Sequence, residues 1–162
     1  LLRLKGRTIK TIYMTYTKIT YSLGIVGLIP FIIGVAFSLF QYEISGVSGV
    51  VIFTTYSLAI LCFLAGSLWG QVLKVPFSSN NQKILIATNL LVVIGWAASL
   101  ASAKFLVPGI IVLGLTFAGI AFLEVKLFKH SAVRQDGAYA RLRFVLTNLV
   151  LAAHAGMVII HA

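Results

Sequence analysis

The order of apolar and polar positions divides the chain into five long apolar segments separated by short polar gaps. The segments cover residues 21–40, 49–73, 84–101, 105–127 and 142–161. An α-helix needs roughly 20 residues to cross a hydrocarbon core of about 30 Å. The pattern therefore predicts an all-α integral membrane protein, a bundle of five transmembrane helices. An alternative is that the third and fourth segments, which are joined only by residues 102–104, form a re-entrant hairpin.

Composition supports a membrane protein without a soluble domain. The chain has 162 residues, of which 60% are hydrophobic and 10% are charged, whereas soluble domains carry about 25% charged residues. We expect two parts, a basic amphipathic N-terminal segment on the inner membrane face (residues 1–20) and a transmembrane domain (residues 21–162). Residues 1–20 also fit the remnant of a targeting sequence, because transit peptides are basic, rich in hydroxyl groups and poor in acids.

Basic residues gather on one side of the predicted bundle. The chain has 13 Lys and Arg but only 3 Asp and Glu, a net charge of +10. If the N-terminus lies inside, every Lys and Arg except Lys104 falls in an inside gap. The tendency of basic loops to stay inside then predicts an inside N-terminus and an outside C-terminus. These residues flank apolar spans, where they meet anionic lipid headgroups, so the charge does not indicate nucleic-acid binding.

Several polar side chains in or near the spans lie at a similar depth close to the inner side. They are Gln71, Asn89, Glu124 and Asn148. Because lipid offers such groups no partner, we expect this inner polar cluster to face the bundle interior or water. One interpretation is hydrogen bonding between helices. The other is an inward-facing polar cavity in which Glu124 pairs with Arg141 or Arg143.

Small and interfacial residues give further predictions. Small residues four positions apart let helices approach closely, and we expect such packing at Gly66 and Gly70 in the second span and at Gly114 and Ala118 in the fourth. Aromatic and basic side chains suit the membrane interface, and the predicted anchors are Trp69, Tyr139, Arg141 and Arg143. Asp136 is the predicted cap of the last helix. Pro30 predicts a kink near residues 26–30.

No sequence pattern indicates catalysis or a metal site. There is no Gly-rich phosphate loop, metalloprotease helix or nucleophile elbow, and His130, Glu124 and Asp136 lack the spacing of zinc ligands. His154 lies inside the fifth span, but a six-coordinate haem needs two axial ligands, and no other span has a histidine at that depth. We therefore expect a protein that is not an enzyme, with no cofactor other than bound lipid.

Three segments in order resemble the transmembrane protein 69 family. They are residues 23–31 (LGIVGLIPF), residues 56–70, which end in FLAGSLWG, and residues 136–147, with Asp136, Tyr139, Leu142-Arg143 and Leu146-Thr147. The resemblance covers about residues 21–160. This family of unknown function occurs in proteobacteria and mitochondria, which implies a bacterial or mitochondrial inner membrane. The family has a histidine before its Trp-Gly pair, where this chain has Leu68.

These features indicate the function only indirectly. A small chain with close-packing faces and no embedded catalytic groups is typical of an accessory or assembly subunit of an energy-transducing inner-membrane complex, such as a respiratory complex. Its partners would be other membrane subunits and membrane lipids, including anionic lipids on the inner face. The alternative is a small transporter, channel or lipid-binding protein that uses the inner polar cavity. Five spans cannot form two equal repeats, which disfavours a transporter built from repeats.

Overall fold

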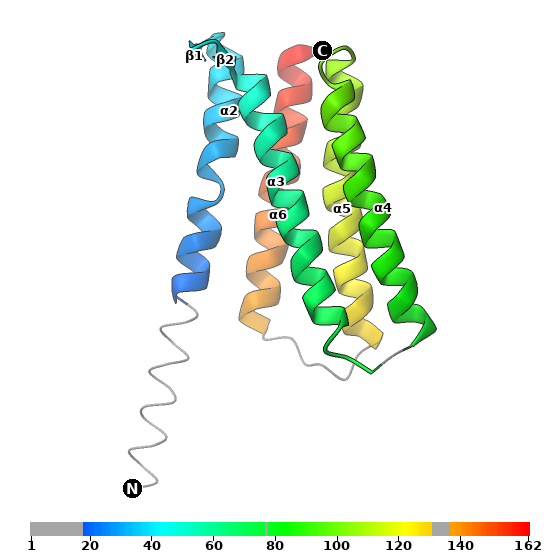
Figure 1. The fold of residues 1–162 in the computed structure, drawn as a ribbon. Coiled ribbons are helices and arrows are strands. Elements are labelled where there is room, and N and C mark those ends of the chain that lie inside the picture. The colour runs from blue at the N-terminus through cyan, green and yellow to red at the C-terminus, as the bar shows by residue number, and fades with distance from the viewer. Residues whose placement is uncertain (1–17, 77, 131–136) are drawn as a thin grey trace, which may run out of the picture.

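The structure, a computed structural model, describes residues 18–76, 78–130 and 137–162. Within them, five helical spans are long and apolar enough to cross a membrane (Figure 1): Lys18–Phe40, Gly49–Val72, Ser79–Ala101, Leu106–Phe128 and Gly137–His161. The first span consists of a helix over residues 18–26 and α2 (Ile29–Phe40). The others are α3 (Gly49–Val72), α4 (Ser79–Ala101), α5 (Leu106–His130) and α6 (Gly137–His161). Five apolar helices are thus confirmed, and α4 and α5 are both of full length.

Helix starts differ from the apolar boundaries because polar residues also join the helices. The helix α4 begins at Ser79, five residues before the apolar segment, and the Ser78 hydroxyl accepts the Asn81 N–H at 3.1 Å. Such a cap satisfies a backbone donor that the first helical turn leaves free. Lys18 is already helical, ahead of the expected border at residue 21. Asp136 and residues 1–17 lie outside the described residues, and so does the predicted helix cap.

A short hairpin joins the first two spans, where the sequence predicted only a loop. Its strands are β1 (Glu43–Ile44) and β2 (Val47–Ser48). Ser45 and Gly46 form the turn with φ of 52° and 77°. Two successive residues with positive φ match the twist of the flanking strands in two-residue hairpins. The hairpin covers the end of the bundle where α2 ends and α3 begins (Figure 1).

The first span is broken at residues 27–28, where the sequence predicted a kink. Both residues form a turn between two helices. Pro30 has no N–H to donate to the preceding turn, and it occupies the start of α2. The Tyr56 hydroxyl of α3 donates to the Gly27 carbonyl at 2.9 Å. A neighbouring helix therefore satisfies a backbone acceptor at the break, which apolar surroundings require.

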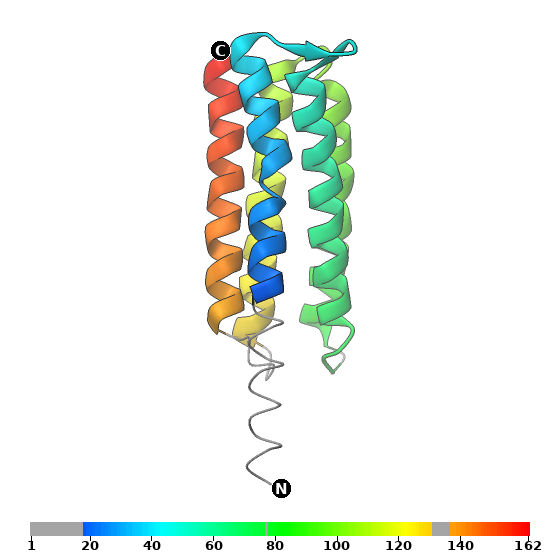
Figure 2. The same cartoon turned by 90° about the vertical axis from the view of Figure 1, so that its left-hand side faces the viewer.

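The spans form an up-and-down bundle in which consecutive helices are neighbours (Figures 1 and 2). The helix α5 packs against α3, α4 and α6, and α6 also contacts α2. Side chains from all five spans make up the core, and its fully buried members include Phe31, Phe53, Leu61, Phe117 and Met157. The lower half of the first span diverges from α3 in Figure 1. This divergence positions the site described below.

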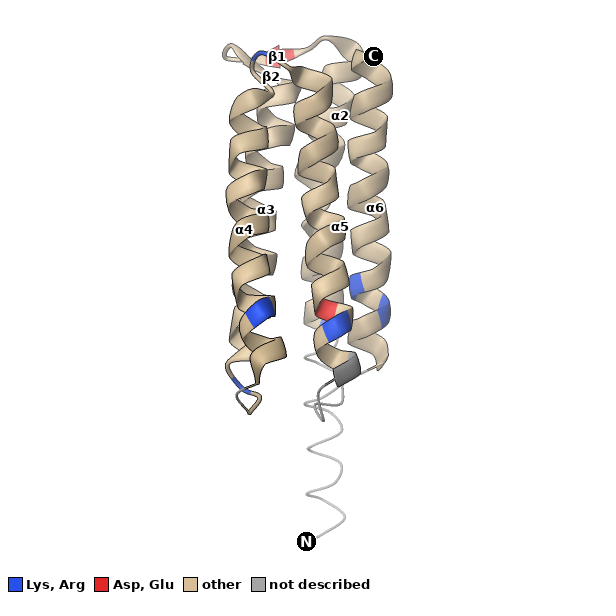
Figure 3. Ribbon diagram, turned by 90° about the vertical axis from the view of Figure 1, so that its right-hand side faces the viewer, with Lys and Arg blue, Asp and Glu red and all other residues tan. Residues whose placement is uncertain are grey.

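Described charges lie mainly at one end of the bundle (Figure 3). We call this end, where the first span and α6 begin and α3 ends, the basic end. It carries Lys18, Lys74, Lys83, Glu124, Lys126, Arg141 and Arg143. Glu43 and Lys104 lie at the opposite end, near the hairpin and the α4–α5 turn. The basic residues that the sequence placed in alternate gaps therefore lie together at one end of the folded bundle.

Candidate functional site

A buried ion pair joins α5 to α6 near the basic end. Arg143 Nη2 donates to Glu124 Oε2 at 2.6 Å, and Arg143 Nε donates to both carboxylate oxygens at 3.1 and 3.2 Å. The exposed fractions of the two side chains are 14% for Arg143 and 9% for Glu124. The sequence left Arg141 and Arg143 open as partners of Glu124. The structure selects Arg143, whereas Arg141 is exposed.

A pocket of about 330 Å³ lies beside this ion pair, between the first span, α3, α5 and α6. Its volume falls in the range of ligand sites, roughly 300–1,000 Å³. Phe63, whose side chain is 70% exposed, lines it on the α3 side. The first span and α3 diverge here toward the basic end (Figure 1). The pocket thus lies on the flank of the bundle that faces the membrane.

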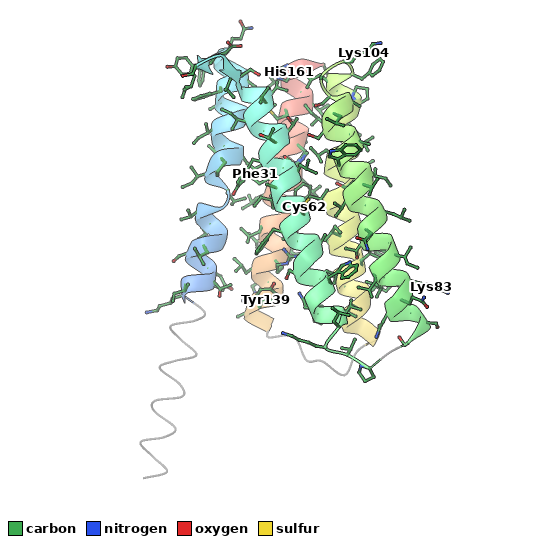
Figure 4. The ribbon with its side chains drawn as sticks, viewed as in Figure 1. Phe31, Cys62, Lys83, Lys104, Tyr139 and His161 are labelled. Atoms are coloured by element: carbon green, nitrogen blue, oxygen red, sulfur yellow. The ribbon has the colours of Figure 1, made fainter. Side chains whose placement is uncertain are left out.

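The pocket has a polar end and an apolar end. Most of its polar lining residues, Thr20, Ser67, Tyr139 and Arg143, lie toward the basic end, and Thr147 lies deeper, one helical turn before Val150. Its deep lining, nearer the middle of the bundle, is apolar and includes Phe31, Ile60, Phe117 and Val150. Figure 4 shows Tyr139 near the start of α6 and Phe31 at mid-height of the first span. An elongated cavity of this polarity fits an amphiphilic molecule.

The first span forms one wall of the pocket and is fastened at several heights. The Tyr21 hydroxyl donates to the Ala138 carbonyl at 3.0 Å, near the start of α6. Gly24 packs so closely on α6 that an added Cβ would lie 2.7 Å from a methyl carbon of Leu146. Further up, Gly27 receives the hydrogen bond from Tyr56. The contacts of Tyr21 and Gly24 hold the wall helix against α6, and the Tyr56 hydrogen bond holds its upper end against α3.

The structure does not bring the predicted inner polar cluster together. Asn89 and Asn148 are exposed, and each donates to the carbonyl four residues earlier in its own helix, at 3.1 and 2.7 Å. Gln71 donates to the Ser67 hydroxyl in α3 at 3.3 Å. Only Glu124 reaches another helix. The correction has a simple cause: similar depth does not imply a shared face, and a helical amide can satisfy itself on its own backbone.

The predicted packing residues behave differently in the two spans. Gly114 faces α6, and an added Cβ would lie 3.3 Å from His154 carbons, while Ala118 is half-buried on α5. Gly66 and Gly70 are exposed, and no described atom outside the adjoining part of α3 lies within 4 Å of an added Cβ at either one. Close packing within the chain therefore occurs at Gly114 and not at the α3 pair.

The predicted anchors also separate into two groups. Trp69 is 37% exposed near the α3 end, and Arg141 is exposed near the α6 start, both at the basic end. Tyr139 and Arg143 instead line the pocket. Sequence reasoning missed Thr147 as part of the same site, although Tyr139, Arg143 and Thr147 recur every four residues. That spacing places them on one face of a helix.

His154 lies in the core, above the deep end of the pocket. Its ring packs against Phe53, Phe117 and Phe31, with centroid distances of 4.8, 5.3 and 6.2 Å. Its Nδ1 donates to the Val150 carbonyl at 2.8 Å. Among the described residues, Nε2 has no hydrogen-bond partner. The aromatic surroundings make His154 a packing residue of the core.

Comparisons with known proteins identify a family but no activity. The chain matches no curated protein and no solved structure. A family of proteins of unknown function, DUF3429, matches residues 16–159, which include all five spans except the last two residues of the fifth. The matched region contains every residue of the pocket and of the ion pair. The chain belongs to the DUF3429 family of proteins of unknown function.

Proposed function

We propose that this chain is a non-catalytic membrane protein that holds a lipid-like amphiphile in the pocket between the first span, α3, α5 and α6. The observation that carries the proposal is the pocket's polarity, with hydroxyl and guanidinium groups toward the basic end and aromatic and aliphatic side chains in the deep part. A membrane lipid has the same order of polar and apolar parts. This function corresponds to the lipid-binding alternative from the sequence.

The pocket also has the length of one leaflet. Tyr139 and Val150 line its two ends on α6, and eleven residues of helix rise about 16 Å. That is about half of a hydrocarbon core of roughly 30 Å. A bound chain whose polar group lies at the basic end would therefore end near the middle of the membrane, as do the chains of neighbouring lipids.

Photocrosslinking tests this function directly. The purified chain, reconstituted in vesicles with a phospholipid that carries a photoactivatable diazirine in its acyl chain, should form adducts on pocket residues such as Leu64 and Leu146. Thr147→Trp fills the pocket and should abolish these adducts. Asn148→Trp, on the neighbouring exposed position of α6, is the matched control and should retain them. Adducts spread evenly over all membrane-facing helices would contradict the proposal.

Orientation and membrane belong to the same proposal. The basic end faces the cytoplasm or the mitochondrial matrix, since basic loops stay on that side. The N-terminus then lies inside and the C-terminus outside. The resemblance to the transmembrane protein 69 family supports a bacterial or mitochondrial inner membrane. Anionic lipids on the inner face are the lipid partners that the basic end favours.

A second candidate function, the accessory or assembly subunit, is supported by the exposed small face of α3. Gly66 and Gly70 are one helical turn apart, with open space above both. Such a face lets a helix of another subunit approach closely. Gly66→Leu with Gly70→Leu should remove subunits that co-purify in mild detergent. Gly156→Leu on α6, a glycine that also has open space above it, is the control. Unchanged co-purification of the double variant would refute this candidate.

A further inference from the structure

The polar end of the pocket is built mainly from hydrogen-bond donors. Arg143 has a guanidinium group with five N–H groups and no acceptor. Its Nε and one Nη2 N–H are used by Glu124, which leaves both N–H groups of Nη1 and one of Nη2 for a ligand. Tyr139 and Thr147 line the same pocket, and each carries a hydroxyl group. This set fits an oxygen-rich acceptor such as a phosphate.

Glu124 holds the guanidinium in place and uses only two of its five N–H donors. The pair is bidentate, and a planar guanidinium engaged on one edge keeps its other edge in a fixed direction. Glu124 is 7% exposed and does not line the pocket, whereas Arg143 does. The carboxylate therefore acts from behind as a positioning residue. It spares the ligand the cost of ordering a long, flexible side chain.

The charges around the polar end favour an anion even though Glu124 offsets Arg143. Lys18 lies two residues before Thr20 on the pocket wall, and Arg141 lies two residues before Arg143 on α6. Among the described residues at the basic end, Glu124 is the only acid, while Lys74 and Lys83 add further positive charge. The local excess of positive charge attracts anionic headgroups to this surface.

Resting on the proposed function, we infer that the pocket selects an anionic phospholipid of the leaflet at the basic end. The phosphate accepts hydrogen bonds from Arg143 and from the Tyr139 hydroxyl. One acyl chain follows the apolar lining toward Phe31 and Phe117. The site thus recognises a phosphate-bearing headgroup, and its apolar part accepts the chain without further selection.

A competition experiment tests the headgroup. The full chain is reconstituted with the photoactivatable phospholipid, and the pocket adduct is competed by lipids with identical acyl chains: phosphatidic acid, phosphatidylglycerol, phosphatidylcholine, diacylglycerol and the free fatty acid. The two anionic phospholipids should compete about tenfold better than diacylglycerol, which has no phosphate to accept from Arg143. They should also compete better than phosphatidylcholine, because its choline cation is repelled by the positive charge of the basic end. Equal competition by diacylglycerol, or stronger competition by the fatty acid, overturns the inference.

Variants separate this inference from the proposed function. Glu124→Gln/Arg143→Gln keeps a neutral hydrogen-bonding pair and should form the pocket adduct without a headgroup preference, within about twofold. Arg141→Gln removes a neighbouring exposed charge and should keep the preference. If the double variant does not fold, Tyr139→Phe provides the second variant and should reduce the preference about threefold. A headgroup preference that is lost in Arg141→Gln but kept in Glu124→Gln/Arg143→Gln would refute headgroup binding by Arg143. If no pocket adduct forms in the unmodified chain, the proposed function itself fails.

Discussion

The ion pair between Glu124 and Arg143 provides the most direct test of the packing of α5 against α6. Both side chains are largely buried, at 9% and 14% exposed. Removing one partner of a buried pair leaves an uncompensated charge and costs about 3–5 kcal/mol. Glu124→Gln and Arg143→Met should each therefore destabilise the chain by about 3 kcal/mol. That is more than a hundredfold in the unfolding equilibrium, at about 1.4 kcal/mol for each factor of ten.

The double variant gives the coupling between the two residues. Because it leaves neither charge unpaired, Glu124→Gln/Arg143→Met should lose about 2 kcal/mol less than the sum of the single variants. Arg141→Met is the matched control, and this exposed neighbour should change stability by less than about 0.5 kcal/mol.

The free energy of unfolding of all four variants is measured by reversible unfolding with sodium dodecyl sulfate in mixed micelles, with helix content as the signal. Single variants that cost less than about 1 kcal/mol each and add independently would refute the reasoning. That result would mean that water solvates the pair and that it does not join the two helices.

Other variants test separate parts of the structure. Gly66→Ala should stabilise the chain by about 0.5–1 kcal/mol, because the new methyl group meets open space and Gly is a poor helix former. Gly109→Ala should destabilise it by about 1–3 kcal/mol, since the added Cβ would lie 2.8 Å from backbone at the end of α4. The same unfolding assay measures both glycine variants. Changes of the same sign in their free energies of unfolding would contradict the packing described for these two glycines. Tyr56→Phe should cost about 1 kcal/mol by leaving the carbonyl at the helix break without its donor; no loss in that assay would show that the bond does not stabilise the break. In a cysteine-free background, an impermeant thiol reagent applied outside intact cells should label Lys104→Cys and not Lys83→Cys, and the reverse pattern would invert the proposed orientation.

Sequence reasoning located the spans because the membrane imposes a length and a polarity that hydropathy records along the chain. The kink at Pro30 was predictable for a similar reason, since proline acts on its own helix. The hairpin was less visible, because two residues per strand leave no period to detect. The clustering of basic residues at one end follows from alternating loops, once the spans are known.

The faces of the helices were not predictable in the same way. Helices in lipid are apolar on all sides, so their sequences carry little information about which side is buried. Thr88 is fully buried while its neighbour Asn89 is exposed. Gly114 packs on α6, whereas Gly66 meets open space, although both belong to small-residue pairs of the same spacing.

By itself, the sequence determined that the chain has five segments long and apolar enough to span a membrane, a kink in the first and a concentration of basic residues on one side. Only the tertiary structure decided that Glu124 pairs with Arg143. Residues two apart on a helix point about 200° away from each other, so α5 can meet Arg141 or Arg143 but not both. The pocket has the same origin, because it requires residues of the first span, α3, α5 and α6 to be brought side by side. Helix rotation and packing set these contacts, and hydropathy along the chain does not record them.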